Sequence, residues 1–191
     1  LTRRARWLLP IFLLLLVGLT FRHLLFPDPH ALTLFSGATM GTTWSVKLAG
    51  PPLDSASHGR VLGAVETELE RVNRLMSSWD PGSELSRFNR WESPQPFPLS
   101  PSNIEVFALA AEVSEQSGGA FDITVGPLVA AWGFGADAAG TETPSPDQLS
   151  QLGERVGYHR LRLDPKSGSI RKQHPGISAD LSAIAKGYAV D

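Results

Sequence analysis

The sequence contains no cysteine among its 191 residues. Without a thiol, the chain has no disulfide framework, no thiolate metal site, no cysteine nucleophile and no N-terminal cysteine that a lipid could modify. The redox compartment of the protein therefore has to be inferred from other features of the sequence.

Charge of either sign is also scarce. The 17 basic and 19 acidic residues leave a formal net charge of -2 at pH 7. A nucleic-acid-binding domain typically has a strongly basic face, so we expect no nucleic-acid partner. With 42% hydrophobic residues, the composition is that of an ordinary globular protein, and the length suits one domain or part of a larger one.

One long apolar run stands near the beginning of the chain. Three arginines within the first six residues precede a leucine-rich run without charge over residues 7–21, a pattern typical of a membrane-directing segment. The run is short for a span of about 20 residues, but Arg22 could snorkel and extend it to Phe26. Because no small-x-small cleavage site follows, we predict an uncleaved anchor over residues 1–26, with a cleaved signal peptide as the alternative. A stiff, proline-containing linker follows over residues 27–32.

The remaining residues, 33–191, show strand and helix patterns in mixed order, without the regular alternation of a doubly wound sheet. We therefore predict a single α+β domain. The patterns predict a half-buried hairpin over residues 33–48, a helix over 61–76, a helix capped by Ser100 and ended by the glycines at 118 and 119, a capping box at Ser145, and a second hairpin over 161–170. The helix after Ser100 is expected to bury Ile104, Phe107, Ala108 and Ala111.

Residues 177–191 carry the most distinctive local pattern. We predict a short buried strand over residues 177–181, an N-cap at Ser182 and the first turns of a helix over the remaining residues. Such a strand-to-helix corner brings Asp180 beside unpaired backbone groups, where a phosphate and a metal ion could bind. Because the sequence stops inside this predicted helix, we expect the 191 residues to be a piece of a longer protein.

Two further segments contain residues that could contact a ligand as well as pack in a core. In residues 38–43, Gly41 would let the backbone approach a ligand, and Met40 offers a soft apolar surface. The alternative for this segment is a hairpin turn with a core methionine. In residues 76–89, which read as a helix end, a turn and a short capped helix, Trp79 could stack on a flat ring or be a core aromatic.

A fourth segment covers residues 119–129. Gly119 and Gly126 bracket a predicted short strand that contains Asp122 next to Phe121. A carboxylate on a largely apolar strand must accept hydrogen bonds, either from a neighbouring loop or from a ligand. From the residues alone, we favour the neighbouring loop.

Taken together and in this order, the four segments resemble the ApbE family of flavin transferases, and the resemblance extends over residues 33–191. Members of that family are exported, bind FAD and Mg²⁺, and transfer the FMN half of FAD onto a threonine hydroxyl of a target protein with release of AMP. The resemblance implies flavin-nucleotide contacts at Met40, Trp79, Ala120, Phe121, Asp122, Asp180 and Lys186. It also implies a magnesium contact through the main-chain carbonyl of Ala183, and Mg²⁺ prefers oxygen ligands of this kind.

The resemblance assigns no catalytic residue in this chain. In the family, the side-chain ligands of the metal are an aspartate and a threonine of a C-terminal half, which we expect to follow residue 191. His159 and His174 match no family role and are predicted to be surface residues. Because the side-chain ligands of the metal would be missing, we expect the 191 residues on their own to be inactive.

The leading hypothesis is an FAD:protein FMN transferase, anchored in the bacterial inner membrane with its domain on the periplasmic or outer face. Its expected partner is an exported flavoprotein with a target threonine, in a membrane electron-transport complex. Two alternatives stay open. One is a module that binds FAD without catalysis, and the other is an FAD pyrophosphatase that releases FMN and AMP with water in place of the threonine.

Overall fold

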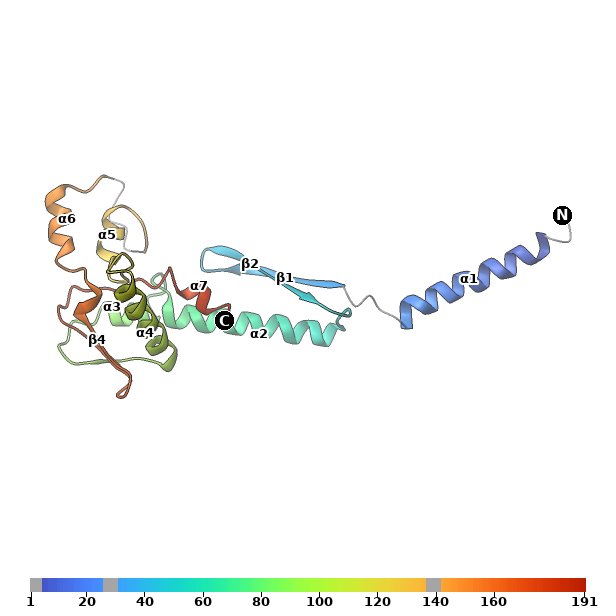
Figure 1. Cartoon of the computed structure of the whole chain (residues 1–191), viewed down its shortest axis with the longest axis horizontal. Helices are drawn as coiled ribbons and strands as arrows, with labels where there is room; N and C mark the ends of the chain where they lie inside the picture. Colours follow the sequence, from blue (N-terminus) through green and yellow to red (C-terminus); the bar gives the residue numbers. More distant parts are fainter. Residues whose placement is uncertain (1–4, 26–30, 137–141) are drawn as a thin grey trace. The chain divides into compact units, whose positions relative to one another are not determined.

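The computed structural model describes residues 5–25, 31–136 and 142–191, and the chain divides into two compact units, Leu1–Val65 and Glu66–Asp191. Helices and strands follow one another in the mixed order predicted for an α+β protein (Figure 1). In chain order they are α1 (Ala5–Leu25), β1 (Leu32–Thr39), β2 (Thr42–Ala49), α2 (Ser55–Met76), α3 (Glu84–Asn89), β3 (Phe97–Pro98), α4 (Pro101–Gln116), α5 (Gly126–Ala131), α6 (Pro146–Gly153), η1 (Tyr158–Arg160), β4 (Leu161–Asp164), β5 (Ser169–Lys172) and α7 (Ala185–Tyr188).

In the first unit, α1 covers most of the apolar run. Its side chains over residues 12–22 are exposed. Within the described residues, no helix combines the length and the apolarity that crossing a membrane requires. Most of the predicted linker, residues 27–32, lies outside the described residues, and β1 already begins at Leu32.

The pairing of the first predicted hairpin is confirmed, but its half-burial is not, because Phe35 is the only buried residue among the described residues of the two strands. β1 and β2 pair antiparallel over their full length, which leaves Met40 and Gly41 as a two-residue turn. Both residues have positive φ angles, 49° and 71°, as the favoured two-residue hairpin turn requires at its central positions. Met40 is only partly buried, so this segment is a hairpin turn but its methionine is not a core residue.

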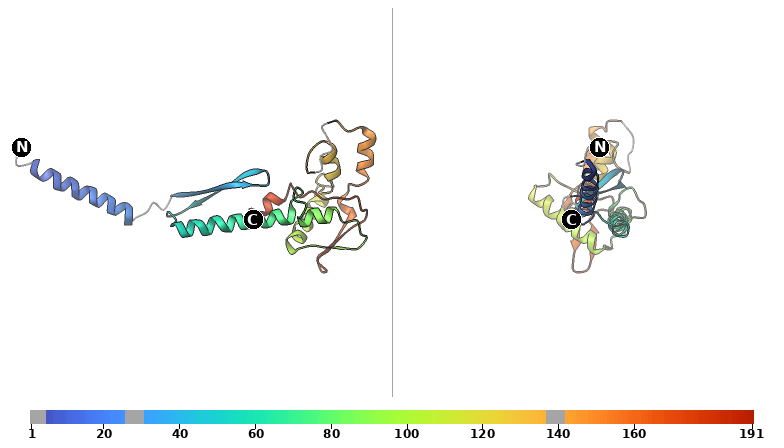
Figure 2. Two further views of the ribbon diagram at one scale, coloured as in Figure 1. Left: turned by 180° about the vertical axis from the view of Figure 1, so that it is seen from behind. Right: turned by 90° about the vertical axis from the view of Figure 1, so that its right-hand side faces the viewer.

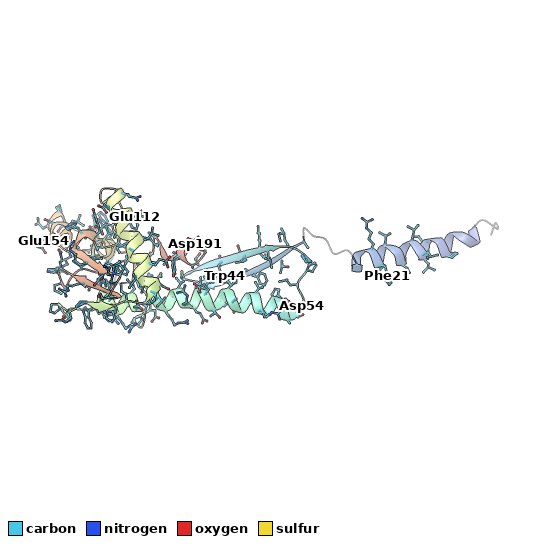
Figure 3. All side chains as sticks on the ribbon, turned by 60° about the horizontal axis from the view of Figure 1, so that its bottom comes forward. Phe21, Trp44, Asp54, Glu112, Glu154 and Asp191 are labelled. Carbon is cyan, nitrogen blue, oxygen red and sulfur yellow. The ribbon has the colours of Figure 1, made fainter. Side chains whose placement is uncertain are left out.

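The helix predicted over residues 61–76 is confirmed, although α2 begins earlier, at Ser55. Asp54, labelled at the start of this helix in Figure 3, accepts a 2.6 Å hydrogen bond from the backbone N–H of Ser57 through its Oδ1. This is the geometry of an N-cap, and the hydrogen bond lowers the pKa of Asp54. The early start was not predicted because the first turns of α2 are polar and lack an apolar stripe.

In the second unit, the core is centred on Phe88 of α3, which is fully buried. Its ring meets Phe97 of β3 and Phe107 of α4 edge-on, with ring centroids 5.7 Å and 5.5 Å away. These edge-to-face contacts join α3, α4 and a three-stranded sheet. The sheet has the order β3-β5-β4 with antiparallel pairs, and it contains the predicted hairpin over residues 161–170.

The ends of α4 are confirmed. Ser100 caps the helix by accepting a hydrogen bond from the backbone N–H of Asn103. At the other end, the N–H of Gly119 donates to the carbonyl of Ser114 at 2.8 Å, which closes a Schellman motif. Local end signals therefore fix the length of this helix.

The buried face of α4 differs in part from the prediction. Phe107 is buried, but Ala108 and Ala111 are exposed. Asn103 and Ser114 are fully buried instead. Their polar side chains are tolerated there because each donates a hydrogen bond to a backbone carbonyl.

The capping box predicted at Ser145 is present at the start of α6. The Ser145 side chain accepts from the backbone N–H of Gln148, and the Gln148 side chain accepts from the backbone N–H of Ser145. α6 lies beside α5, both in the front view of Figure 1 and in the rear view of Figure 2.

Candidate functional site

Hydrogen bonds join three of the four predicted segments, all within the second unit. Asn89, at the end of segment 76–89, makes two hydrogen bonds to the backbone of Ala179. The backbone N–H of Asp180 donates to the carbonyl of Ile123, in segment 119–129, at 2.7 Å. The structure therefore brings these segments together at Asp180, which we call the Asp180 corner (residues 177–184).

The strand predicted over residues 177–181 is wrong. Its alternation of burial is present, since Ile177, Ala179 and Leu181 are each exposed by 2% or less. The backbone of Ala179, however, pairs with the Asn89 side chain, and the N–H of Asp180 donates to the Ile123 carbonyl, so neither pairs with another strand. The alternation thus reflects a buried extended segment without a ladder.

The N-cap predicted at Ser182 is also wrong. The backbone N–H of Ser182 donates to Oδ1 of Asp180 at 2.8 Å, so Asp180 itself closes the turn. α7 begins only at Ala185, and Ile184 before it provides no side-chain cap. Among the described residues, no hydrogen bond ends on the second carboxylate oxygen of Asp180, which leaves that oxygen free to accept from a ligand.

Asp122 lies in a turn before α5, so the strand predicted there is wrong. Its Oδ1 accepts from the backbone N–H of Thr124 at 2.8 Å and from the Thr124 hydroxyl at 2.6 Å. Its Oδ2 accepts from the backbone N–H of Tyr158 at 2.8 Å. The prediction that a neighbouring loop supplies the donors is confirmed for the Tyr158 N–H, while the other two donors belong to Thr124 of the same segment. This carboxylate ties segment 119–129 to the start of η1.

The turn between α2 and α3 holds Trp79 on its outside. Ser83 caps α3 by accepting from the backbone N–H of Ser86 at 2.9 Å, and its hydroxyl donates to the carbonyl of Ser77 at 2.5 Å. Trp79 itself is 71% exposed. The core-aromatic alternative is therefore wrong, and the indole ring is available for stacking on a planar ligand.

Ala183 lies in the wall of a pocket of about 820 Å³ formed by α2, α4 and the C-terminal residues, with Glu68, Arg71 and Glu105 also in the wall. No hydrogen bond among the described residues ends on the Ala183 carbonyl. In the part of the chain that the structure describes, no group of three or more histidine or acidic residues is placed to hold a metal. The described residues therefore offer a metal ion a main-chain oxygen but no cluster of side-chain ligands.

Arg71 ties α7 to α2 next to this pocket. Its guanidinium donates to Glu68 Oε1 at 2.5 Å and to the Ser102 hydroxyl at 2.6 Å, and it lies over the Tyr188 ring at 5.6 Å. Hydrogen bonding to the Glu68 carboxylate, and then to Tyr188, raises the pKa of Arg71 above its ordinary value. The guanidinium, which is charged in any case, thus links Glu68 and Ser102 to Tyr188 of the helix that follows Ala183.

The other predicted flavin contacts stay predictions. Lys186 and Ala120 are exposed and Phe121 is half-buried. No described hydrogen bond joins any of these three side chains to Asp180. Met40 belongs to the first unit. The two histidines without a family role, His159 and His174, are exposed, as predicted.

Two residues near the Asp180 corner were assigned no role by the sequence. One is Asn89, and the other is Lys172, which is 9% exposed on β5. The Lys172 Nζ donates to the carbonyl of Asn89 at 2.8 Å and lies 4.8 Å from the centre of the Phe88 ring. Side chains two residues apart share a strand face. The apolar Ile170, two residues before Lys172, was therefore the sequence signal that could have placed Lys172 inward.

The buried amine of Lys172 should give stability a specific pH dependence. Burial lowers the pKa of Lys172 from 10.5 to about 8, against an opposing effect of Glu92. The cost of burying its charge is therefore fully present below pH 8 and is relieved as pH rises toward 10.5, because the unfolded chain then binds more protons than the native protein. We expect the free energy of unfolding of the natural full-length protein to gain up to about 3 kcal/mol over this range relative to Lys172→Met.

Denaturant titrations of both proteins at a series of pH values measure this difference. Since the substitution removes only this titrating group, other lysines and tyrosines cancel in the comparison. A difference that stays constant from pH 8 to pH 10.5 would contradict a buried amine with a lowered pKa.

Comparison with known proteins identifies the family. The model of the ApbE family matches residues 40–191, a range that includes Met40 and the three joined segments. The chain belongs to the ApbE family. Its α+β fold is correspondingly ApbE-like, because the flavin transferase ApbE from Vibrio cholerae superposes with a TM-score of 0.78 at 36% identity, over 85% of this chain and 52% of that one.

Other ApbE proteins match the chain to a similar extent. The FAD:protein FMN transferase of Klebsiella pneumoniae (strain 342) is 35% identical over 161 residues, which cover 83% of this chain and 45% of that protein. The flavinyl transferase ApbE from Pseudomonas stutzeri, in its apo form, superposes with a TM-score of 0.75 at 31% identity, over 85% of this chain and 53% of that one. This chain thus spans about half the length of the relatives it matches.

Proposed function

We propose that this chain is part of an FAD:protein FMN transferase, which moves FMN from FAD onto a threonine hydroxyl of an acceptor flavoprotein and releases AMP. The observation that carries the proposal is the match to the ApbE family over residues 40–191, together with relatives that bear this name at 35% identity. In the reaction, a bond forms between the threonine oxygen and the FMN phosphorus while the bond from that phosphorus to the AMP oxygen breaks. The hydroxyl proton is released to solvent, so the products are the flavinylated threonine, AMP and one proton.

The described residues fit FAD as a substrate. A long dinucleotide with two flat ring systems calls for an aromatic surface and for carboxylate acceptors facing its hydroxyl and ring donors. Trp79 presents an exposed indole, and Asp180 keeps one oxygen without a partner among the described residues. Asp122 has both oxygens in use within the fold, so we propose that it acts mainly by shaping the segment that carries Ala120 and Phe121.

One atom of this chain is suited to bind Mg²⁺. The Ala183 carbonyl is an oxygen donor without a described hydrogen-bond partner, and Mg²⁺ prefers oxygen ligands while keeping several waters. We propose that Ala183 would contribute this one ligand and that side-chain ligands would come from residues outside this sequence. When bound, the ion would neutralise charge on the pyrophosphate and on the departing AMP.

The cellular setting belongs to the same proposal. The basic start and the apolar run over residues 7–21 support an anchor in the bacterial inner membrane with the domain on the periplasmic or outer face. The acceptor would then be an exported flavoprotein, which we propose to be part of a membrane electron-transport complex. Protection of a C-terminal tag from protease in intact spheroplasts would contradict this orientation.

The test uses the natural full-length protein with FAD, Mg²⁺ and an acceptor that carries a candidate threonine. We expect flavin fluorescence to stay on the acceptor band after denaturing electrophoresis, and to be absent with EDTA or with a Thr→Ala acceptor. AMP release without fluorescence on the acceptor would favour the pyrophosphatase alternative instead. FAD binding without AMP release would favour a binding module.

If Trp79 stacks on the flavin, its replacement should weaken FAD binding. Replacing it with alanine should weaken FAD binding about tenfold, because stacking of an aromatic side chain on a base contributes roughly 1–3 kcal/mol. The melting temperature should not change, since the ring is exposed. Titration of flavin fluorescence measures the affinity, and Trp132→Ala is the matched control because Trp132 is also exposed, by 50%, but has no predicted flavin contact. Equal losses in both variants would argue against a stacking role.

A further inference from the structure

The side chain of Asn89 pairs with the backbone of Ala179 as another strand would. Asn89 Nδ2 donates to the Ala179 carbonyl at 2.9 Å, and Asn89 Oδ1 accepts from the Ala179 N–H at 2.8 Å. A side-chain amide offers one donor side and one acceptor side in a plane, as a peptide group does. Both backbone groups of the residue immediately before Asp180 are thus held by a single side chain.

Asn89 is in turn fixed from the sheet. It is the last residue of α3, and its own carbonyl accepts the 2.8 Å hydrogen bond from Lys172 Nζ. A lysine at a helix C-terminus satisfies a carbonyl that the helix leaves without a partner. The ammonium also lies over the Phe88 ring, so the stem and the head of Lys172 are both held in the core.

The next backbone group is held by a different segment of the chain. The Asp180 N–H donates to the Ile123 carbonyl at 2.7 Å, and Asp122 next to it is anchored by three hydrogen bonds. The backbone at Asp180 is thus fixed at two points. α3 holds Ala179 through Asn89, and segment 119–129 holds the Asp180 N–H through the Ile123 carbonyl. Of these two attachments, the one through Ala179 is made by a side chain and can be removed by mutation.

We infer that Asn89 is a positioning residue for flavin-nucleotide binding, that its amide sets where the Asp180 carboxylate stands, and that Lys172 holds Asn89 in place. This inference rests on the proposed function, because it takes Asp180 as a contact of FAD. Asn89 would not touch FAD itself. Its effect passes through one peptide unit, and displacements of about 1 Å in a binding group can cost on the order of a hundredfold in rate.

The test compares three variants of the natural full-length protein, Asn89→Ala, Asp180→Asn and the double variant. We expect Asn89→Ala to weaken FAD binding in the presence of Mg²⁺ about tenfold, and to weaken it by less than about twofold further when Asp180 is already asparagine. An equal loss in both backgrounds would overturn the inference, because Asn89 would then act independently of Asp180.

Asn103→Ala is the matched control. Asn103 is also an amide that holds a backbone carbonyl, that of Leu75, and it is fully buried, but it contacts no residue of the Asp180 corner among the described hydrogen bonds. Its loss should lower the melting temperature at least as much as Asn89→Ala, yet change FAD affinity by less than about twofold. A loss of affinity as large as that of Asn89→Ala would assign the effect to general destabilisation and overturn the inference.

Hydrogen exchange separates this inference from the proposed function, because it needs no ligand. In Asn89→Ala, the backbone amides of Ala179 and Asp180 should exchange at least about tenfold faster relative to the other core amides than in the natural protein, while in Asn103→Ala these two amides should be accelerated no more than the rest of the core. Unchanged protection in Asn89→Ala would overturn the positioning role. If the natural protein failed to bind FAD but the exchange result held, the proposed function would fail and the structural link between Asn89 and the corner would stand.

Discussion

Replacing Asp180 with asparagine should lower the rate of flavin transfer by about a hundredfold, the magnitude typical of losing one fixed polar contact in an active site. Asparagine has nearly the same shape and keeps an oxygen for the 2.8 Å hydrogen bond from the Ser182 N–H. The turn should therefore persist, and the melting temperature should stay within a few degrees. What the variant loses is the negative charge and acceptor strength of the free carboxylate oxygen. The rate of AMP release by the natural full-length protein measures the effect.

Asp164→Asn is the control for this substitution. Asp164 closes a turn in the same way, with its Oδ1 accepting from the backbone N–H of Lys166 at 3.0 Å, but it lies at the tip of the β4–β5 hairpin and is exposed. Its replacement should leave flavin transfer unchanged within about twofold. Normal activity of Asp180→Asn, or an equal loss in both variants, would remove Asp180 from the site.

Replacing Phe88 with alanine should destabilise the protein by about 3–5 kcal/mol, the usual cost of removing a buried phenylalanine. Phe88 is fully buried and meets both Phe97 and Phe107 edge-on. It also lies under the Lys172 ammonium at 4.8 Å, so a cavity here leaves that charge without its aromatic neighbour. Since whole domains are stable by only about 5–15 kcal/mol, this loss should remove a large fraction of the protein's stability and lower its melting temperature markedly.

Chemical denaturation of the natural full-length protein measures this loss, with Phe134→Ala as the control. Phe134 is the same residue type but is 68% exposed, so its replacement should change the free energy of unfolding by about 0.5 kcal/mol or less. A loss below about 1 kcal/mol for Phe88→Ala would contradict the description of α3 as the centre of the second unit's core.

Features that depend on neighbouring residues were predicted well. The caps at Ser100 and Ser145, the glycine end of α4 and the hairpin turn at Met40 and Gly41 all arise from groups within a few residues of one another. Their physical cause is therefore contained in the local sequence. The mixed α+β class followed from the same local patterns.

Features that depend on distant partners were not predicted. The Asp180 corner is extended because Asn89 and Ile123 hold it, and both lie far away in the sequence. The turn at Asp122 likewise depends on Tyr158. An apolar alternation indicates which side chains are buried, but it does not reveal whether the backbone pairs with a strand, a loop carbonyl or an amide side chain.

The buried face of α4 shows the same limit for polar residues. Periodicity of apolar residues favoured Ala108 and Ala111, whereas Asn103 and Ser114 occupy the interior. Burial of these side chains depends on hydrogen bonds to carbonyls, which a hydrophobic pattern cannot encode. Asn89 and Lys172 were missed for the same reason, although they hold the corner that carries the candidate site.

The most direct test of the proposed activity is the ratio of AMP released to FMN bound covalently to the acceptor, measured on the natural full-length protein with FAD and Mg²⁺. Mass spectrometry of the acceptor gives the bound FMN, and chromatography of the supernatant gives the AMP. A transferase releases one AMP for each FMN attached to a threonine. AMP in large excess over attached FMN, or no AMP at all, would contradict the proposal that this ApbE chain belongs to a flavin transferase.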